Sequence, residues 1–273
     1  VPPRAQWLRV LLAEFTRLQH HLLWLSSSAA ELGLAVATAG QSVAAELTEV
    51  LARWTGTRMH TMVVRYGGLR DDPGPAWVVQ AAEIAPRAAR IAAAVAHELA
   101  TDPRSVGVGV LTATEARVWA TSGPVARASG VALDLRDTAA AADPYAELVG
   151  DSDFHVVSRP AGDAAARFAV LGAEAEVSGA CVVAAALRLV ELDGPVSVAL
   201  PKVIRVPEGV GYHAVESPTG RSGWYLDSRR HYSLPVGDAH GIIRQCDVAA
   251  SGVAGYWRRG PTRSADVVRA CCG

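Results

Sequence analysis

The sequence predicts a mostly α protein of the α+β class, with a helical bundle as its core and a small β-hairpin added near its end. Three observations predict this class. Apolar residues recur at helical spacing in several long segments, proline and glycine mark helix ends, and strand-like residues flank one strong turn signal. No alternation of strands and helices of the kind that builds a parallel sheet is present.

The first half of the chain predicts two paired helices. Pro2-Pro3 suits a first helical turn, where a missing backbone N–H costs nothing, and apolar residues then follow one helical face to Leu25. Off this stripe, Glu14 is spaced to pair with Arg17 one turn later. A second helix is expected over residues 43–54, followed by a glycine that can end it.

The middle of the chain predicts a short extended piece and then more helix. Residues 57–69 contain β-branched and aromatic residues and end in a Gly-Gly turn. An alanine-rich helix is expected to run to about Leu99, with a break or kink at Pro86. Thr112–Glu115 has the form of a capping box and predicts a short helix. Residues 121–162 are rich in Gly, Pro, Asp and Ser and predict a long ordered loop.

The last periodic segments predict one helix and one hairpin. An apolar stripe from Phe168 to Leu189 predicts a helix that ends at Gly194-Pro195. A type I turn and its two strands are expected over Ser217–Gly220, Tyr212–Glu216 and Trp224–Leu226. We therefore expect residues 1–200 to form the bundle core and 201–228 the hairpin segment. Residues 229–273 show no sustained period and predict an atypical, poorly ordered tail.

Composition and motifs exclude several classes of function. A net charge of -1 gives no electrostatic basis for nucleic-acid binding, and no apolar run approaches the roughly 18–20 residues that span a bilayer. The four cysteines lack C-x-x-C spacing, which supports neither a zinc site nor an iron–sulfur cluster. Gly107-Val108-Gly109 lacks the third glycine of a dinucleotide site, and Ser26–Ser28 lacks a nucleophile-elbow pattern. Adjacent His20 and His21 diverge on a helix, so we expect partly buried interfacial histidines and no metal site.

One short non-helical segment contains several basic side chains and a histidine. Arg58, His60, Arg65 and Arg70 place several cations and one imidazole close together in the sequence. Such a cluster suits an anionic or redox-active neighbour, because a histidine can follow its charge near neutral pH. An ion-pair network within the loop is an equally good explanation from composition alone.

Six separated motifs, in the right order, resemble the 49 kDa subunit family (the D subunits) of proton-pumping NADH:quinone oxidoreductase, respiratory complex I. The resemblance covers residues 1–228. Its motifs are Val1–Leu11 with Glu14, Arg17 and His21-Leu22; Gly56–His60 with Arg65–Gly68; Val106–Gly109 with Ser122–Gly130; Asp134–Arg136 with Pro144-Tyr145; Gly162-Asp163 with Arg167-Phe168 and Glu174; and Gly209–Leu226.

The resemblance implies a fold and a place in a larger assembly. The family is related to the large subunit of nickel–iron hydrogenases, with a helical bundle at its centre. Its members pack on the subunit that carries the terminal iron–sulfur cluster, and the two form the quinone headgroup pocket. The implied partners also include the 30 kDa subunit and the quinone-channel membrane subunit. The implied location is peripheral, on the cytoplasmic side of the cell membrane.

The resemblance also assigns cofactors and residues. Quinone is the substrate, NADH and the iron–sulfur clusters belong to partner subunits, and this chain binds no cofactor itself. Ser27 and Glu31 match the hydroxyl and carboxylate of the quinone pocket, where the family usually has Thr and Asp. His60 matches the histidine near the terminal cluster. Arg65 and Arg127 match arginines with a structural or cluster-facing role.

The chain departs from the family at both ends. The family's two principal quinone ligands, a His and a Tyr, lie upstream of the residue that matches Val1, so we assign no catalytic residue here. Residues 229–273 lack the family's C-terminal pattern, which suggests a frameshifted reading.

Three functions are compatible with this pattern. The first is a subunit that is catalytic only in assembly, and the second is a catalytically inactive helical scaffold or truncated remnant that is poorly soluble alone. A hydrogenase large subunit is the third, but it would need two C-x-x-C pairs that this chain lacks.

Overall fold

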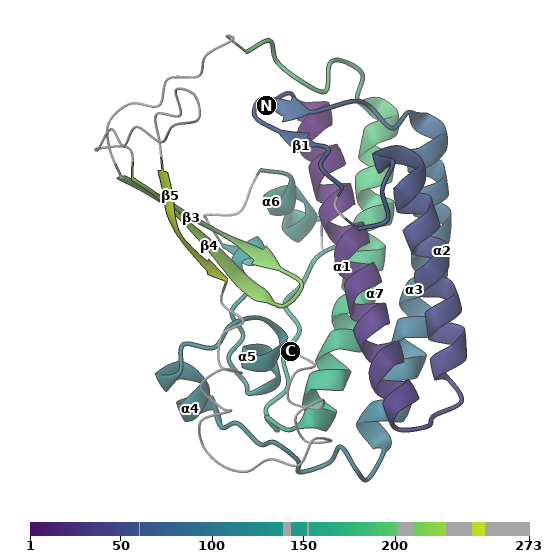
Figure 1. Cartoon of the computed structure of the whole chain (residues 1–273), viewed down its shortest axis with the longest axis vertical. Helices are drawn as coiled ribbons and strands as arrows, with labels where there is room; N and C mark the ends of the chain where they lie inside the picture. Colours follow the sequence, from purple (N-terminus) through teal and green to yellow (C-terminus); the bar gives the residue numbers. More distant parts are fainter. Residues whose placement is uncertain (60, 139–142, 152, 201–209, 228–241, 249–273) are drawn as a thin grey trace.

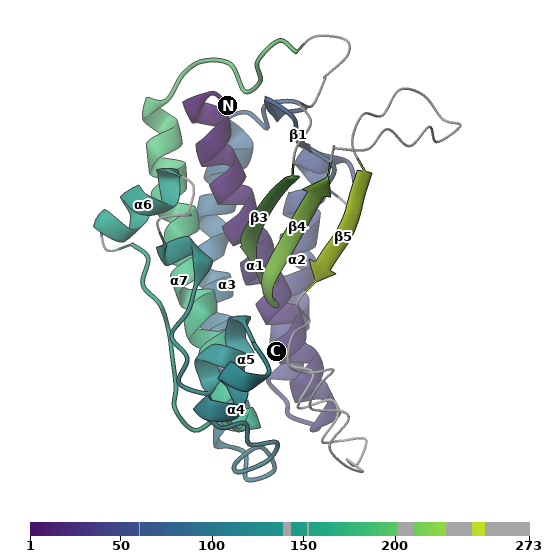
Figure 2. The same cartoon turned by 90° about the vertical axis from the view of Figure 1, so that its left-hand side faces the viewer.

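Four long helices form the core of the protein. The computed structural model describes residues 1–273 except 60, 139–142, 152, 201–209, 228–241 and 249–273. The helices lie side by side as a bundle, with the β-sheet and the short helices on one flank (Figures 1 and 2). They are α1 (Pro3–Glu31), α2 (Ala37–Thr55), α3 (Pro75–Thr101) and α7 (Ala164–Glu191). This arrangement confirms the predicted mostly α fold.

Helix α1 forms through the signals that its sequence carries. Pro3 occupies the first helical turn, and the apolar stripe is buried, with Leu8, Leu18 and Leu25 fully inaccessible to solvent. Gly56 ends α2 in a left-handed conformation with φ of 77°. In such a conformation a Cβ atom is strained, which is why glycine commonly occupies this position.

Helices α3 and α7 make the closest contact in the bundle because small residues line it. A Cβ atom added to Gly172 would lie 2.4 Å from the Cβ of Ala96, and one added to Gly179 would lie 2.8 Å from that of Ala89. A break or a kink was predicted at Pro86, and the break is wrong, because α3 continues through this residue. The kink stays a prediction. Proline removes one backbone hydrogen bond, and the packing of the rest of the helix outweighs that loss.

Short helices connect the core elements. They are α4 (Ala113–Val118), α5 (Gly123–Ala128), the 3₁₀ turn η1 (Leu135–Asp137) and α6 (Asp143–Gly150). The capping box at Thr112 and Glu115 is confirmed, since each side chain accepts from the backbone N–H of the other residue. The prediction of a loop over 121–162 is wrong in part, because elements this short leave no periodic signal in the sequence.

Two antiparallel sheets complete the fold. The small one pairs β1 (Val64–Arg65) with β2 (Gly68–Leu69), as the extended piece and Gly-Gly turn predicted. The larger one has the order β3-β4-β5, from Val210–Ser217, Gly220–Asp227 and Ile242–Val248. The hairpin is therefore confirmed. The tail, which was predicted to be poorly ordered, contributes the strand β5. The other residues of 229–273, with the expected frameshift and disorder, lie outside the described residues.

Helix α7 is the most apolar of the four long helices. Within the described part of the chain it is the one helix long and apolar enough to cross a membrane by length and composition, with a mean hydropathy of 1.6. Two thirds of the 18-residue stretch of α7 that has this hydropathy is buried inside the protein. The helix packs against α1 and α3. Its apolarity is that of a core helix. The expectation that no segment reaches this length was therefore wrong for α7.

Candidate functional site

The two residues that match the quinone pocket lie at the end of α1. Ser27 and Glu31 are both exposed and are four residues apart, so they share one face of the helix. Glu31 is the last residue of α1, where the chain turns toward α2. Both polar side chains are therefore available to a ligand or partner at this end of the bundle.

The predicted cation cluster lies at the other end of α2. Arg58 pairs with Glu49 at 2.7 Å and Arg70 pairs with Asp71 at 2.5 Å, so part of the cluster is a surface ion-pair network. Arg65 is exposed in β1. His60 lies outside the described residues. Because α2 has 19 residues, its length of about 28 Å separates this segment from Glu31, and the two predicted sites are not brought together.

Arg127 lies inside the molecule and not on a surface. Its side chain has no solvent exposure, and its guanidinium contacts three carboxylates. The distances are 2.6 Å to Glu174, 2.8 Å to Glu216 and 3.2 Å to Asp134. These contacts join α5, α7, the η1 segment and β3. Arg127 was expected to have either a structural role or a role facing the cluster. Its three buried ion pairs fit the structural role.

Glu14 is the second centre of the same network. Its carboxylate, fully buried on α1, accepts bonds from Arg136 at 3.0 Å, Tyr145 at 2.6 Å and Ser178 at 2.7 Å. The predicted pair with Arg17 is confirmed at 3.5 Å. We call Glu14, Arg17, His21, Arg127, Asp134, Arg136, Tyr145, Glu174, Ser178 and Glu216 the buried polar network.

Arg17 connects this network to the tip of the hairpin. Its two terminal nitrogens donate to the backbone oxygens of Glu216 and Ser217, at 2.6 and 2.9 Å. The Glu216 side chain also accepts from the backbone N–H of Leu135 at 3.3 Å. A planar guanidinium with several fixed donors suits such paired acceptors. The hairpin is thus fastened to α1 and α5 through both backbone and side chain.

His21 belongs to the network as a neutral donor. Its Nε2 donates to Glu174 at 3.1 Å, and the side chain is fully buried. The prediction of an interfacial His21 is therefore wrong, because the helix turns it toward α7. Burial lowers the pKa of His21, and the charges of Arg17 and Arg136 lower it further, although Glu174 opposes the shift. The pKa of His20 falls to about 4, mainly through burial.

The arginines keep the network carboxylates ionised. Burial alone would raise the pKa of Glu14, but Arg136 and Arg17 outweigh it and lower the pKa to about 2. The pKa of Glu174 also lies well below its usual range, because Arg127 and His21 outweigh the effect of burial. The network therefore holds fixed opposite charges at neutral pH. This arrangement suits it to holding elements in place, not to proton exchange.

Sequence reasoning identified only part of this network. The Glu14–Arg17 pair followed from helical spacing, whereas Glu174, Arg136 and Tyr145 entered only as motif residues. The signal available in the sequence was a charged residue beside buried apolar positions of α1 and α7, which is uncommon without a partner. Within the described ranges, no group of three or more His, Cys, Asp or Glu side chains could hold a metal ion.

Replacing Arg127 by methionine should strongly destabilise the protein. Three buried carboxylates would lose their shared partner, and such a loss costs about 3–5 kcal/mol. Urea denaturation followed by circular dichroism measures the change. Arg87→Met is the matched control, because Arg87 pairs with Glu46 on the surface and its loss should leave stability nearly unchanged. Equal stability of the two variants would contradict a structural role for the network.

The stability of the protein should fall as the pH drops from 6.5 toward 4. His20 has an ordinary pKa of 6.5 and a folded-state pKa of about 4, so within this window only the unfolded chain binds the proton. The slope is at most about 1.4 kcal/mol per pH unit for each such histidine. Urea denaturation at several pH values measures it, and His20→Gln should flatten the curve. An unchanged slope in that variant would contradict the assignment.

The chain is similar to known proteins both in sequence and in fold. A family model described as "Respiratory-chain NADH dehydrogenase, 49 Kd subunit" matches residues 38–236. The chain is 39% identical over 235 residues to the second D subunit of NADH-quinone oxidoreductase from Salinispora arenicola, covering 84% of this chain and 60% of that protein. It is 32% identical over 252 residues to the D subunit of F(420)H(2) dehydrogenase from Methanosarcina mazei, covering 86% and 65%.

The fold has a similar counterpart among solved structures. A chain of the membrane-bound sulfane sulfur reductase, an archaeal respiratory membrane complex, superposes with a TM-score of 0.80 and 27% identity. The match covers all of this chain and 73% of that one. The present chain spans about three fifths of the length of the curated relatives. On these matches, the chain belongs to the 49 kDa subunit family of the respiratory-chain NADH dehydrogenase.

Proposed function

We propose that this chain is a subunit of a proton-pumping NADH:quinone oxidoreductase and is catalytic only within that assembly. The observation that carries the proposal is its family membership, since relatives at 38–40% identity are named as D subunits of NADH-quinone oxidoreductase. In this proposal quinone is the substrate, and NADH and the iron–sulfur clusters are held by partner subunits. The chain is peripheral on the cytoplasmic side of the membrane.

An exposed apolar segment supports an interface with the subunit that carries the terminal cluster. Between the ends of α2 and β1, Met59 is 82% and Met62 75% exposed, and Tyr66 follows at 82%. Large apolar side chains gathered on a surface mark protein contacts in soluble proteins. In the sequence, this segment includes His60 and Arg65, the residues proposed to face the cluster. Arg9 of α1 holds the segment against the bundle by donating hydrogen bonds to the backbone oxygens of Arg65 and Gly68.

The end of α1 supports a contribution to the quinone pocket. Ser27 offers a hydroxyl and Glu31 a carboxylate on one exposed face. Reduction of a quinone takes up two protons, so groups that donate hydrogen bonds or relay protons belong beside its oxygens. In this proposal a partner subunit covers this end of α1 and completes a pocket around the two side chains. The 30 kDa subunit and the quinone-channel membrane subunit are the further partners proposed.

Assembly into the complex tests the proposal directly. Native gels of host membranes, stained for NADH oxidation and blotted for this chain, should show both signals in one large band. Tyr66→Glu should lower the assembled fraction about tenfold, since burying an unpaired charge in an interface is costly. Val118→Glu changes a residue of α4 that is 74% exposed, and this variant should assemble normally. A chain found only outside NADH-oxidising assemblies would favour the inactive scaffold or remnant.

Quinone kinetics test the pocket. Glu31→Ala should lower quinone reduction by roughly tenfold in assembled membranes, because it removes a group placed for proton transfer. Glu83→Ala, an exposed glutamate of α3, is the matched control. Stability should be unaffected in both variants, since both side chains are exposed. Full quinone reductase activity of Glu31→Ala, with the variant assembled, would contradict a role for Glu31 in the pocket.

A further inference from the structure

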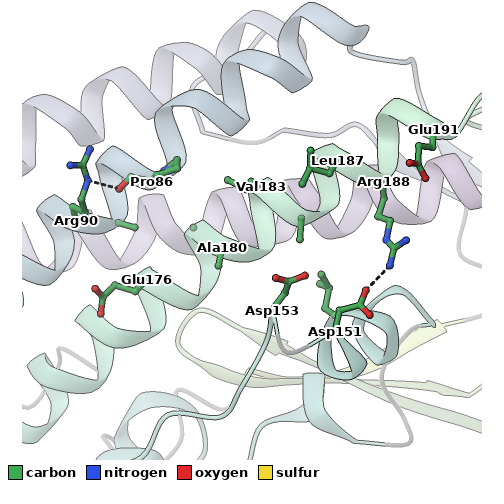
Figure 3. Close-up of a pocket in the computed structure, with 14 residues that line it drawn as sticks. Pro86, Arg90, Asp151, Asp153, Glu176, Ala180, Val183, Leu187, Arg188 and Glu191 are labelled. Atoms are coloured by element: carbon green, nitrogen blue, oxygen red, sulfur yellow. Dashed lines mark hydrogen bonds and ion pairs between the residues drawn. The ribbon is translucent and has the colours of Figure 1, made fainter.

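A long apolar groove crosses the face of the bundle formed by α3, α6 and α7. It encloses about 660 Å³, and helix α7 forms its floor (Figure 3). The floor residues Ala180, Val183, Ala184 and Leu187 recur at helical spacing. They lie on the side of α7 that the bundle does not cover, and Leu187 is 65% exposed. Pro86 and Ala89 of α3 form one wall, and Leu148 of α6 contributes to the other.

The rim of this groove carries an excess of negative charge. The lining holds four carboxylates against two guanidinium groups, those of Arg90 and Arg188. Arg188 pairs with Asp151 at 2.5 Å, and Arg90 donates to the backbone oxygen of Pro86. Within the described part of the chain, Asp153, Glu176 and Glu191 make no ion pair. Figure 3 shows Glu176 toward one end of the groove and Glu191 at the other. Their separation of 15 positions on α7 corresponds to about 22 Å. A complementary occupant therefore carries basic residues near both ends of an apolar stripe about four turns long.

The shape and chemistry of the groove select a helix. Its floor and one wall are helices whose backbone groups are already bonded internally, so an extended segment finds no strand edge to pair with. A helix satisfies its own backbone and presents side chains to the groove. The small side chains of Ala180 and Ala184 permit an interaxial distance of about 8–10 Å, which is usual for packed helices. Carboxylates on the rim disfavour anionic lipid at the same place.

We propose that this groove seats an amphipathic helix with basic ends, contributed by another subunit of the respiratory complex. The inference rests on the proposed function, because it takes the partner from the same assembly. It assigns an interface distinct from the exposed segment around Tyr66, which lies at the end of α2. The apolar stripe of the partner covers Val183 and Leu187, and its basic residues meet Glu176 and Glu191.

Site-specific cross-linking in native membranes tests the inference. A photoreactive phenylalanine analogue replaces Val183 in the full chain, and Val79, an exposed valine of α3 outside the groove, is the matched control position. Irradiation at position 183 should yield one cross-linked product with another subunit. Mass spectrometry should place it in a segment with apolar residues at helical spacing and Lys or Arg at both ends. Position 79 should not yield that product.

Charge reversal provides a second, independent measurement. The double variant Glu176→Lys, Glu191→Lys should lower the assembled fraction on native gels about tenfold, and added salt should narrow the difference from wild type. Glu83→Lys is the matched control, because Glu83 is an exposed glutamate of α3 that does not line the groove. Equal assembly of the double variant and the control would overturn the inference.

The outcomes separate this inference from the proposed function. A chain that assembles normally but cross-links at position 183 to a second copy of itself, to lipid, to an acidic segment or to nothing overturns the groove inference alone. A chain absent from NADH-oxidising assemblies before irradiation overturns the proposed function, and the partner assignment falls with it.

Discussion

The buried polar network is the interaction on which the rest of the structure depends. Arg127 and Glu14 are its two centres, and through them α1, α5, α6, α7 and the β3 strand share one set of charges. Removing opposite charges from water is costly, and only near-complete pairing compensates for it. A wrongly docked hairpin would leave Glu216 or Arg127 unpaired. The network therefore specifies how the elements meet more than it adds to stability.

The network fixes the hairpin on one flank of the bundle, and other parts of the bundle surface stay exposed. Among the described residues, the bundle presents the end of α1 at Glu31, the segment around Tyr66 and the groove along Leu187 to solvent. Each presents chemistry that suits a partner, and none is a complete site by itself. These surfaces fit the proposed role of a subunit that acts within an assembly. Its charged interior is fixed, and its incomplete sites lie on the outside.

The candidate sites could be predicted from the sequence only in part. The motif around Ser27 and Glu31 indicated polar residues at a helix end, and the structure leaves both exposed. The interior place of Arg127 was not predictable, because its three carboxylate partners lie between 7 and 89 positions away. A local pattern cannot report such contacts. For the same reason, His21 looked interfacial until the packing of α7 placed Glu174 against it.

The sequence by itself determined the long helices, their ends and the hairpin, because these depend on local spacing and on single residues such as Gly56. Only the tertiary structure decided the short helices between 123 and 150, the continuity of α3 through Pro86, and the third strand, β5. Segments as short as these helices are not stable in isolation, and a proline inside a helix costs stability through its lost backbone hydrogen bond. Contacts with elements distant in the sequence outweigh both costs, and these contacts exist only in the folded protein.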